Sequence, residues 1–107
     1  MSTLTTHVLD TALGAPAMGI RVTLERDGNV LGSGVTDADG RVKDLVKATL
    51  DGGKYELRFD VAGYFAKSGR ESFYTDIAVS FQVKDGTENY HVPLLLSPFG
   101  YSTYRGS

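Results

Sequence analysis

Apolar and polar residues alternate along several short stretches of the chain, the pattern of β-strands that bury one face. Between Ile20 and Arg26 every second residue from Ile20 to Leu24 is apolar, and Lys54–Phe59 repeats the pattern with Tyr55, Leu57 and Phe59 on one side. The same reasoning predicts further strands at Leu4–Asp10, Val30–Thr36, Ile77–Val83 and Tyr90–Leu96, with one more strand following Gly100.

Turn residues separate these stretches. Asp27–Asn29 (DGN) is a strong hairpin signal between two of the strands. Gly32 and Gly34 thin the strand that follows and predict a bulge or a close approach of another segment. We also expect irregular chain at Leu13–Ala17, Asp85–Glu88 and Ser97–Gly100.

One segment, Asp60–Gly69, is typical of a helix rather than a strand. Asp60 can cap its first turn and Gly69 can end it. The residues expected to face inward are Val61, Ala62, Phe65 and Ala66. With seven to eight short strands, we predict an all-β, two-sheet sandwich with one short helix, forming a single domain over residues 1–107.

The composition of the chain limits the partners and the cellular compartment that we expect. The chain carries 11 basic and 13 acidic residues without a basic run, so nothing favours nucleic acid. It contains no cysteine, which excludes disulfides and thiolate chemistry and agrees with a reducing compartment. Residues 1–6 lack the pattern of a signal peptide, and no apolar run has membrane-spanning length. We expect a cytoplasmic protein without a membrane partner.

The two histidines are the best candidates for proton exchange near neutral pH. Strand alternation sets His7 opposite Leu4 and Val8, and sets His91 opposite Val92. If the apolar sets face the core, both imidazoles face away from it. Alternation alone leaves two readings open, a pair of surface or structural histidines and a functional pair.

Metal binding is the weaker interpretation of these polar residues. Asp37–Gly40 (DADG) has a faint likeness to a calcium loop, but the later ligands and the terminal glutamate are missing. Two histidines fall short of the three protein ligands that catalytic zinc requires. We therefore predict no metal site.

The stretch from His91 to Ser107 combines an apolar strand, a turn and a segment rich in tyrosine and threonine. Its outward faces mix imidazole, aromatic and cationic groups, with Leu95 beside His91 and Tyr101 in line with Arg105. Such a face is more typical of an interface or cleft than of free surface. We expect this end of the chain to close an active site between subunits, with the terminal carboxylate beside an arginine.

The chain resembles the transthyretin-like 5-hydroxyisourate hydrolases along its whole length. The stretches that carry the resemblance are Thr5–Thr11 (TTHVLDT), Gly14–Ala17 (GAPA), Thr36–Arg41 (TDADGR), Tyr90–Pro98 (YHVPLLLSP) and Tyr104–Ser107 (YRGS). The last of these looks like the mark that separates the hydrolases from hormone-carrying transthyretins. One departure is Tyr74-Thr75, where the family usually has an aromatic residue followed by proline.

The resemblance implies a homotetramer built as a dimer of dimers, with active sites in the channel between the dimers. It implies hydrolysis of 5-hydroxyisourate to 2-oxo-4-hydroxy-4-carboxy-5-ureidoimidazoline, without a metal or other cofactor. By position it implies catalytic roles for His7, Arg41, His91 and Ser107. It also implies that Tyr104 lines the substrate pocket together with His7 and Arg41.

Hydrolysis of a flat, oxygen-rich ring requires a base for water, a group that stabilises the developing oxyanion, and a rigid pose. We assign the role of the base to His7, with His91 orienting it or relaying the proton. Arg41 is expected to bind the carbonyl oxygens of the substrate. Ser107 offers a hydroxyl and a carboxylate for the water or a histidine.

Three other readings remain. A transthyretin-like carrier would bind a small ligand without chemistry. A structural or adhesive sandwich module and a zinc site at the two histidines are less compatible with the sequence.

Overall fold

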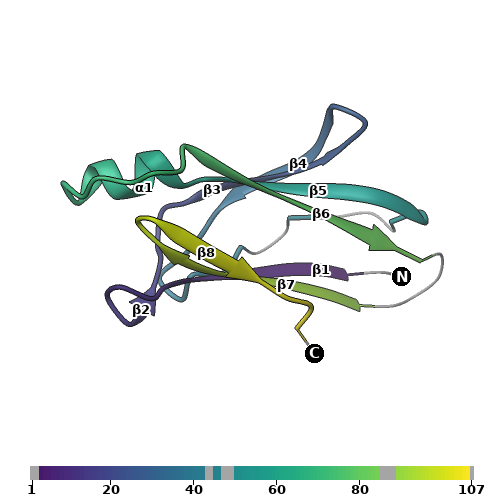
Figure 1. The fold of residues 1–107 in the computed structure, drawn as a ribbon. Helices are drawn as coiled ribbons and strands as arrows, with labels where there is room; N and C mark the ends of the chain where they lie inside the picture. The colour runs from purple at the N-terminus through teal and green to yellow at the C-terminus, as the bar shows by residue number, and fades with distance from the viewer. Residues whose placement is uncertain (1–2, 43–44, 47–49, 85–88, 107) are drawn as a thin grey trace.

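The computed structural model describes residues 3–42, 45–46, 50–84 and 89–106. In this part of the chain two four-stranded sheets face each other, with a short helix at one end (Figure 1). The first, here called the β1 sheet, has the order β2 (Ala15–Pro16), β1 (Thr3–Asp10), β7 (Asn89–Ser97), β8 (Gly100–Thr103). The second, the β3 sheet, has the order β4 (Asn29–Val35), β3 (Arg21–Arg26), β5 (Gly53–Asp60), β6 (Asp76–Val83). The predicted all-β sandwich with one short helix is confirmed.

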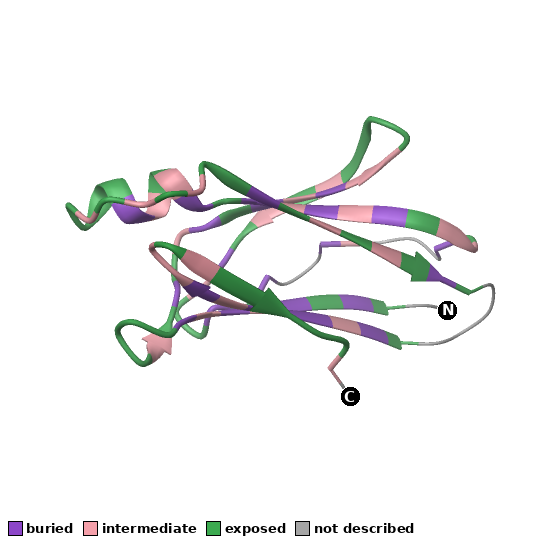
Figure 2. Ribbon diagram, viewed as in Figure 1, coloured by how far each residue is buried: buried purple, intermediate pink, exposed green. Residues whose placement is uncertain are grey.

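The two sheets bury alternate residues of their strands against each other. Figure 2 shows buried positions alternating with intermediate ones along β5. Fully buried side chains from the central strands include Val22, Leu24, Leu57, Phe59, Leu94 and Leu96. Each such side chain contributes about 1.5–3 kcal/mol when it leaves water, so this layer supplies most of the driving force for folding.

Strands β1 and β7 are neighbours and run parallel, although they come from opposite ends of the sequence. Thr5 lies opposite His91, and His7 lies opposite Pro93. Parallel neighbours need a long connection, and here that connection contains the whole β3 sheet. The register puts both histidines on the outer face of the β1 sheet, as alternation predicted.

Strand β8 ends earlier than the sequence suggests. It pairs with β7 only as far as Thr103, opposite Leu94, and the backbone contact returns at Gly106, opposite His91. Between them lies Pro93, which has no N–H to donate to a neighbouring strand. The gap explains why residues 104–105 leave the sheet and why the chain comes back beside His91.

The β3–β4 hairpin matches its turn signal. Asp27 and Gly28 both have positive φ, at 52° and 80°, as a two-residue hairpin of this hand requires. The register shifts so that Leu31 has no partner on β3, which is the predicted bulge. A Cβ atom at Gly32 would overlap the carbonyl oxygen of Leu45, which is the predicted close approach.

The helix, α1 (Val61–Lys67), begins where we expect. Asp60 caps it by accepting a hydrogen bond of 3.3 Å from the Gly63 N–H. Gly69, just beyond the helix, has a φ of 68°, which glycine adopts at little cost. Val61 and Phe65, one turn apart, are buried. The expectation that Ala66 also faces inward is wrong, because a helix of two turns presents only one narrow stripe to the core.

Among the described residues, one carboxylate lies fully inside the fold. Asp10, at the end of β1, accepts hydrogen bonds of 2.7 Å from both Arg70 and Tyr64, and 3.1 Å bonds from the Ala12 and Leu13 N–H groups. Burial alone would raise the pKa of Asp10. The hydrogen bonds from Arg70, Tyr64 and Leu13 outweigh burial and hold the pKa below its usual value. This cluster fastens the helix and the turn after β1 to the β1 sheet.

The remaining differences concern loops. The segment Leu13–Ala17, expected to be irregular, contains the two-residue strand β2, which pairs with the end of β1. The turn expected at Asp85–Glu88 lies outside the described residues. No helix in the part of the chain that the structure describes is long and apolar enough to cross a membrane.

Candidate active site

His7 stands half-buried on the outer face of β1, while its neighbour Val8 points into the core. A turn places Arg41 next to it. Within this turn Asp37 accepts backbone hydrogen bonds from the N–H groups of Asp39 (2.9 Å) and Arg41 (3.1 Å). The turn then lies along β1, with Val8 donating to the Gly40 carbonyl at 2.8 Å and His7 opposite Arg41.

This geometry gives the DADG sequence a structural role. One Asp37 oxygen closes the turn through backbone N–H groups, and Gly40, with a φ of 76°, lies so close to Val8 that a Cβ would overlap its carbonyl oxygen. Among the described residues no three His, Asp or Glu side chains gather as metal ligands. The role of the turn is therefore to place Arg41 beside β1, opposite His7.

His91 is held on the neighbouring strand. Its Nδ1 atom lies 2.8 Å from the hydroxyl oxygen of Thr5, the residue directly opposite on β1. On the other side Gly106 donates a 2.8 Å hydrogen bond to the His91 carbonyl oxygen. Gly106 also packs against the imidazole, since a Cβ there would overlap the ring carbon Cδ2.

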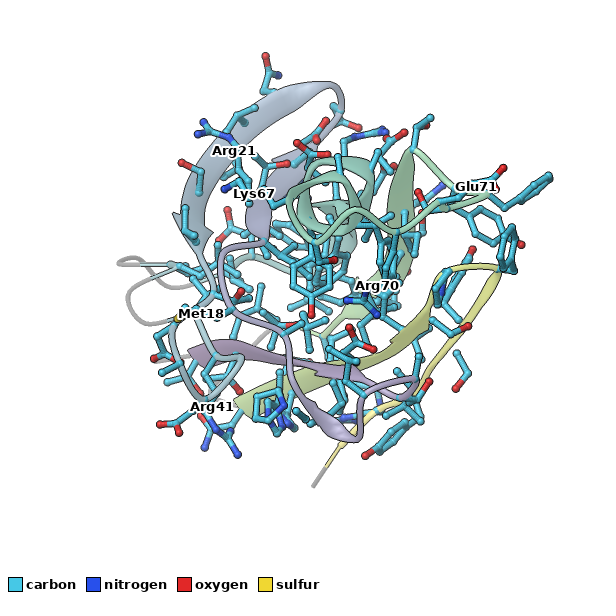
Figure 3. The ribbon with its side chains drawn as sticks, turned by 90° about the vertical axis from the view of Figure 1, so that its left-hand side faces the viewer. Met18, Arg21, Arg41, Lys67, Arg70 and Glu71 are labelled. Carbon is cyan, nitrogen blue, oxygen red and sulfur yellow. The ribbon has the colours of Figure 1, made fainter. Side chains whose placement is uncertain are left out.

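A hollow of about 400 Å³ opens at this place, with Thr5, Arg41, His91 and Gly106 in its wall. That volume is in the range of small-ligand sites. His7 is not part of the wall itself and adjoins it through Arg41. A second hollow of about 320 Å³ adjoins the first and shares Thr3, Thr5 and Arg41 with it. Figure 3 shows Arg41 pointing away from the core, in contrast to Arg70, which points into it.

The electrostatics of the site favour a neutral imidazole. Partial burial lowers the pKa of His91, and the positive charge of Arg41 and the proximity of His7 lower it further, against a smaller opposing effect of the Thr5 backbone. A histidine with a lowered pKa is mostly unprotonated at neutral pH and can accept a proton.

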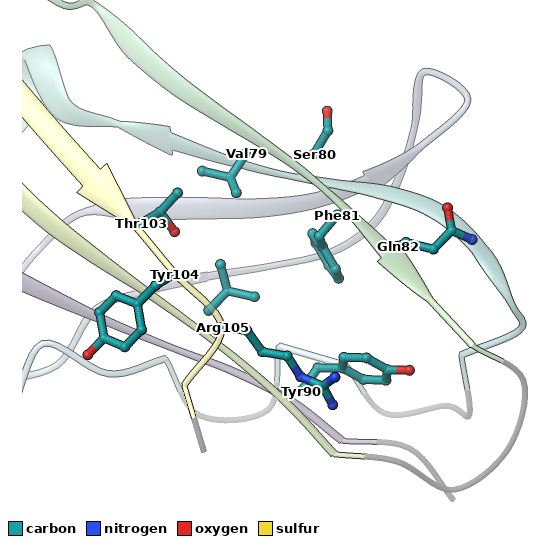
Figure 4. A pocket seen from close by; sticks show the side chains of 9 residues that line it. Val79, Ser80, Phe81, Gln82, Tyr90, Thr103, Tyr104 and Arg105 are labelled. Carbon is teal, nitrogen blue, oxygen red and sulfur yellow. The ribbon is translucent and has the colours of Figure 1, made fainter.

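Of the other two predicted site residues, Tyr104 does not join this group within one chain. Tyr104 lines a separate, mainly apolar hollow of about 330 Å³ between the free edges of the two sheets. Figure 4 shows its ring turned away from Phe81, while Arg105 reaches over the Tyr90 ring at 4.8 Å. Ser107 lies outside the described residues.

Sequence reasoning missed Thr5 as a member of the site. Alternation did put Thr5 on the same face as His7, but nothing local fixes the register of two strands so far apart in sequence. The hydroxyl could have been recognised only with knowledge that β1 and β7 pair in parallel.

The two four-stranded sheets, with histidines and an arginine beside a hollow on the outside of one of them, define a β-sandwich of the transthyretin class. The chain belongs to the HIUase/Transthyretin family, whose model matches residues 4–106.

Relatives with established names agree with this membership. The chain is 44% identical to the 5-hydroxyisourate hydrolase of Mus musculus, over 99% of this chain and 96% of that one. It is 46% identical to the 5-hydroxyisourate hydrolase of Halalkalibacterium halodurans, over 96% of each chain.

Solved structures give the same result. The 5-hydroxyisourate hydrolase of Klebsiella pneumoniae superposes with a TM-score of 0.92 at 44% identity, covering 100% of both chains. Sea bream transthyretin in complex with thyroxine superposes with a TM-score of 0.88 at 31% identity, over 96% of this chain and 93% of that one.

Proposed function

We propose that this protein is an enzyme that hydrolyses 5-hydroxyisourate to 2-oxo-4-hydroxy-4-carboxy-5-ureidoimidazoline in the breakdown of urate. The observation that carries the proposal is that Arg41 and His91 line one open hollow, with His7 directly opposite Arg41 on the neighbouring backbone. The full-length similarity to hydrolases, at 44–46% identity, supports the same reaction.

Proton transfer falls to the two histidines. His7 deprotonates the attacking water, and His91 orients it or relays the proton. The lowered pKa of His91 supports this division, because a neutral partner is ready to receive a proton.

Arg41 holds the substrate's oxygens. Its guanidinium presents a planar set of donors that matches neighbouring carbonyl oxygens of a flat ring, and its charge stabilises the oxyanion that forms when water adds. Ser107, which directly follows Gly106, contributes a hydroxyl or carboxylate to the water or to a histidine.

The working form is a homotetramer, a dimer of dimers. The free edges of the two sheets, β6 and β8, support this part of the proposal because unpaired edges invite pairing with another copy. The hollow between those edges is lined by apolar side chains that include Val79 and Phe81. Tyr104 belongs to that hollow in one chain, so its contact with substrate requires assembly. A sedimentation experiment that gives a monomer at working concentration would contradict this state.

The reaction is tested on freshly made substrate. Urate oxidase converts urate to 5-hydroxyisourate, and its ultraviolet absorbance is followed after this protein is added. We expect a decay much faster than in buffer, and faster than with a variant that lacks both histidines. A decay that the protein leaves unaccelerated contradicts the proposal. We assign the protein to the cytoplasm, in agreement with its lack of cysteine.

A carrier of small ligands is the second candidate. The similarity to sea bream transthyretin in complex with thyroxine favours it. A carrier needs no proton-accepting pair, so thyroxine binding without acceleration of 5-hydroxyisourate decay would decide for this alternative.

A further inference from the structure

The imidazole of His91 is contacted on two sides by residues without an assigned role. The Thr5 hydroxyl lies 2.8 Å from Nδ1, across the parallel β1–β7 pair. Gly106 lies against the Cδ2 edge, at the point where the chain returns to β7. Thr5 is exposed and its hydroxyl contributes nothing to the core, so the core does not require its contact with His91.

An imidazole has two nitrogens, and the partner of one determines what the other can do. With Nδ1 occupied by Thr5, Nε2 is the nitrogen left for water or substrate. A threonine hydroxyl can donate to an unprotonated Nδ1 or accept from a protonated one, because its hydrogen rotates. Thr5 can therefore stay bonded to His91 before and after a proton moves.

Gly106 restricts the ring from the opposite side. A side chain as small as a methyl group at this position would overlap Cδ2 of His91 and approach the Pro93 ring to 3.3 Å. The ring would have to turn about its side-chain bonds, and turning would take Nδ1 away from the Thr5 hydroxyl. Glycine at 106 and threonine at 5 thus act on the same orientation of one imidazole.

We propose that Thr5 and Gly106 are positioning residues that together fix the orientation of the His91 imidazole. The inference rests on the proposed hydrolysis, in which His91 orients or relays a proton. Neither residue touches the reacting atoms, so their effect on the rate acts through His91.

Thr5→Val tests the hydroxyl, because valine keeps the shape of threonine and removes the hydrogen bond. We expect kcat for 5-hydroxyisourate to fall about tenfold, the effect of losing one hydrogen bond, with KM nearly unchanged. Thr5→Ser restores the hydroxyl and should return kcat to within about twofold of the original protein. Thr23→Val is the matched control, since Thr23 lies on β3 and its hydroxyl contacts only Glu25, at 3.0 Å, among the described residues.

Nitrogen-15 NMR of His91 separates positioning from a general loss of structure. In Thr5→Val the shift of Nδ1 should move because this nitrogen loses its hydrogen-bond partner, and in Thr5→Ser it should stay at the original value. Gly106→Ala should produce the same change, and the combined Thr5→Val, Gly106→Ala variant should lose less activity than the product of the two single losses.

Unchanged His91 shifts in Thr5→Val would overturn the proposal, whatever happens to activity. Independent, multiplicative losses in the double variant would also overturn it, because they would mean that the two residues act on different groups. If the unaltered protein fails to hydrolyse 5-hydroxyisourate, the proposed function fails, and the NMR comparison still decides whether Thr5 and Gly106 hold His91.

Discussion

Strand β1 carries two polar side chains, His7 and Asp10, three residues apart, which lie on opposite faces of the strand. Asp10 points inward, is fully buried, and has its carboxylate oxygens bonded to Arg70, Tyr64 and two backbone N–H groups. His7 points outward, half-buried, next to Arg41 and an open hollow. A buried charge must be satisfied within the protein, whereas a half-buried imidazole at a hollow keeps bonding capacity for a ligand.

The comparison separates stability from activity. The Asp10 cluster joins β1, the helix and the loop after it, so its loss should loosen the fold and leave the chemistry of folded molecules intact. The His7 and His91 site lies outside the core, so its loss should remove the chemistry and leave the fold.

The largest effect is expected from His7→Ala or His91→Ala. Each should lower turnover of 5-hydroxyisourate by about 100-fold or more, because proton transfer of this kind accounts for about 10²–10⁴-fold. Thermal unfolding should show little change in either variant, since neither side chain is in the core. Full activity in one variant would remove that histidine from the mechanism.

Asp10→Asn should lower the stability of the fold and leave the activity of folded molecules intact. Asp10 is fully buried, and its replacement leaves Arg70 without its charged partner in a largely enclosed position. We therefore expect Asp10→Asn to lower the free energy of unfolding by about 3 kcal/mol. Asp76→Asn is the matched control, because Asp76 pairs with Arg58 at the surface and should matter much less.

The effect of Asp10→Asn should also depend on pH. The pKa of Asp10 is lowered by folding, so its contribution is complete above the unfolded value of about 3.9 and is lost as the pH falls through the folded value. Denaturant titrations between neutral and acidic pH measure this. A stability difference between the two proteins that stays constant down to the most acidic pH would contradict the pairing.

Tyr64→Phe should give a smaller change of the same kind. It removes one of the hydrogen bonds to the Asp10 carboxylate and keeps the ring against Phe65, so we expect a loss of about 1.5 kcal/mol. Turnover per folded molecule should match that of the original protein. A large loss of turnover at full stability would mean that the cluster also serves the site.

The smallest effect is a displacement of the pH profile. Because the pKa of His91 is lowered, its protonation requires a more acidic solution than free imidazole does. The acidic limb of kcat/KM for 5-hydroxyisourate should therefore have its midpoint below about 6.5. A midpoint clearly above that value would indicate that another group controls the limb.

Local pattern was enough to predict most of the fold. Alternation located the strands, the Asp27–Asn29 signal located the hairpin, and Asp60 located the start of the helix. The same alternation correctly put His7 and His91 opposite the core. These features depend on neighbours within a few residues, which a sequence displays directly.

Contacts between distant segments could not be predicted in this way. The pairing of Thr5 with His91 depends on a parallel register, and the burial of Asp10 depends on Arg70, which is 60 residues away. The early end of β8 also depends on a neighbour, because Pro93 on β7 interrupts the pairing. The residue types were visible, but their partners are set by tertiary structure.

The parallel pairing of β1 with β7 also has a consequence for biosynthesis. Residues 86 positions apart must meet before the Thr5–His91 contact exists, so the nascent chain carries β1 without that neighbour until β7 has left the ribosome. Contacts between such remote positions also make folding slow. We expect catalytic activity to arise only at the last stage of folding. A chain that stalls on the ribosome before β7 is made should therefore be inactive.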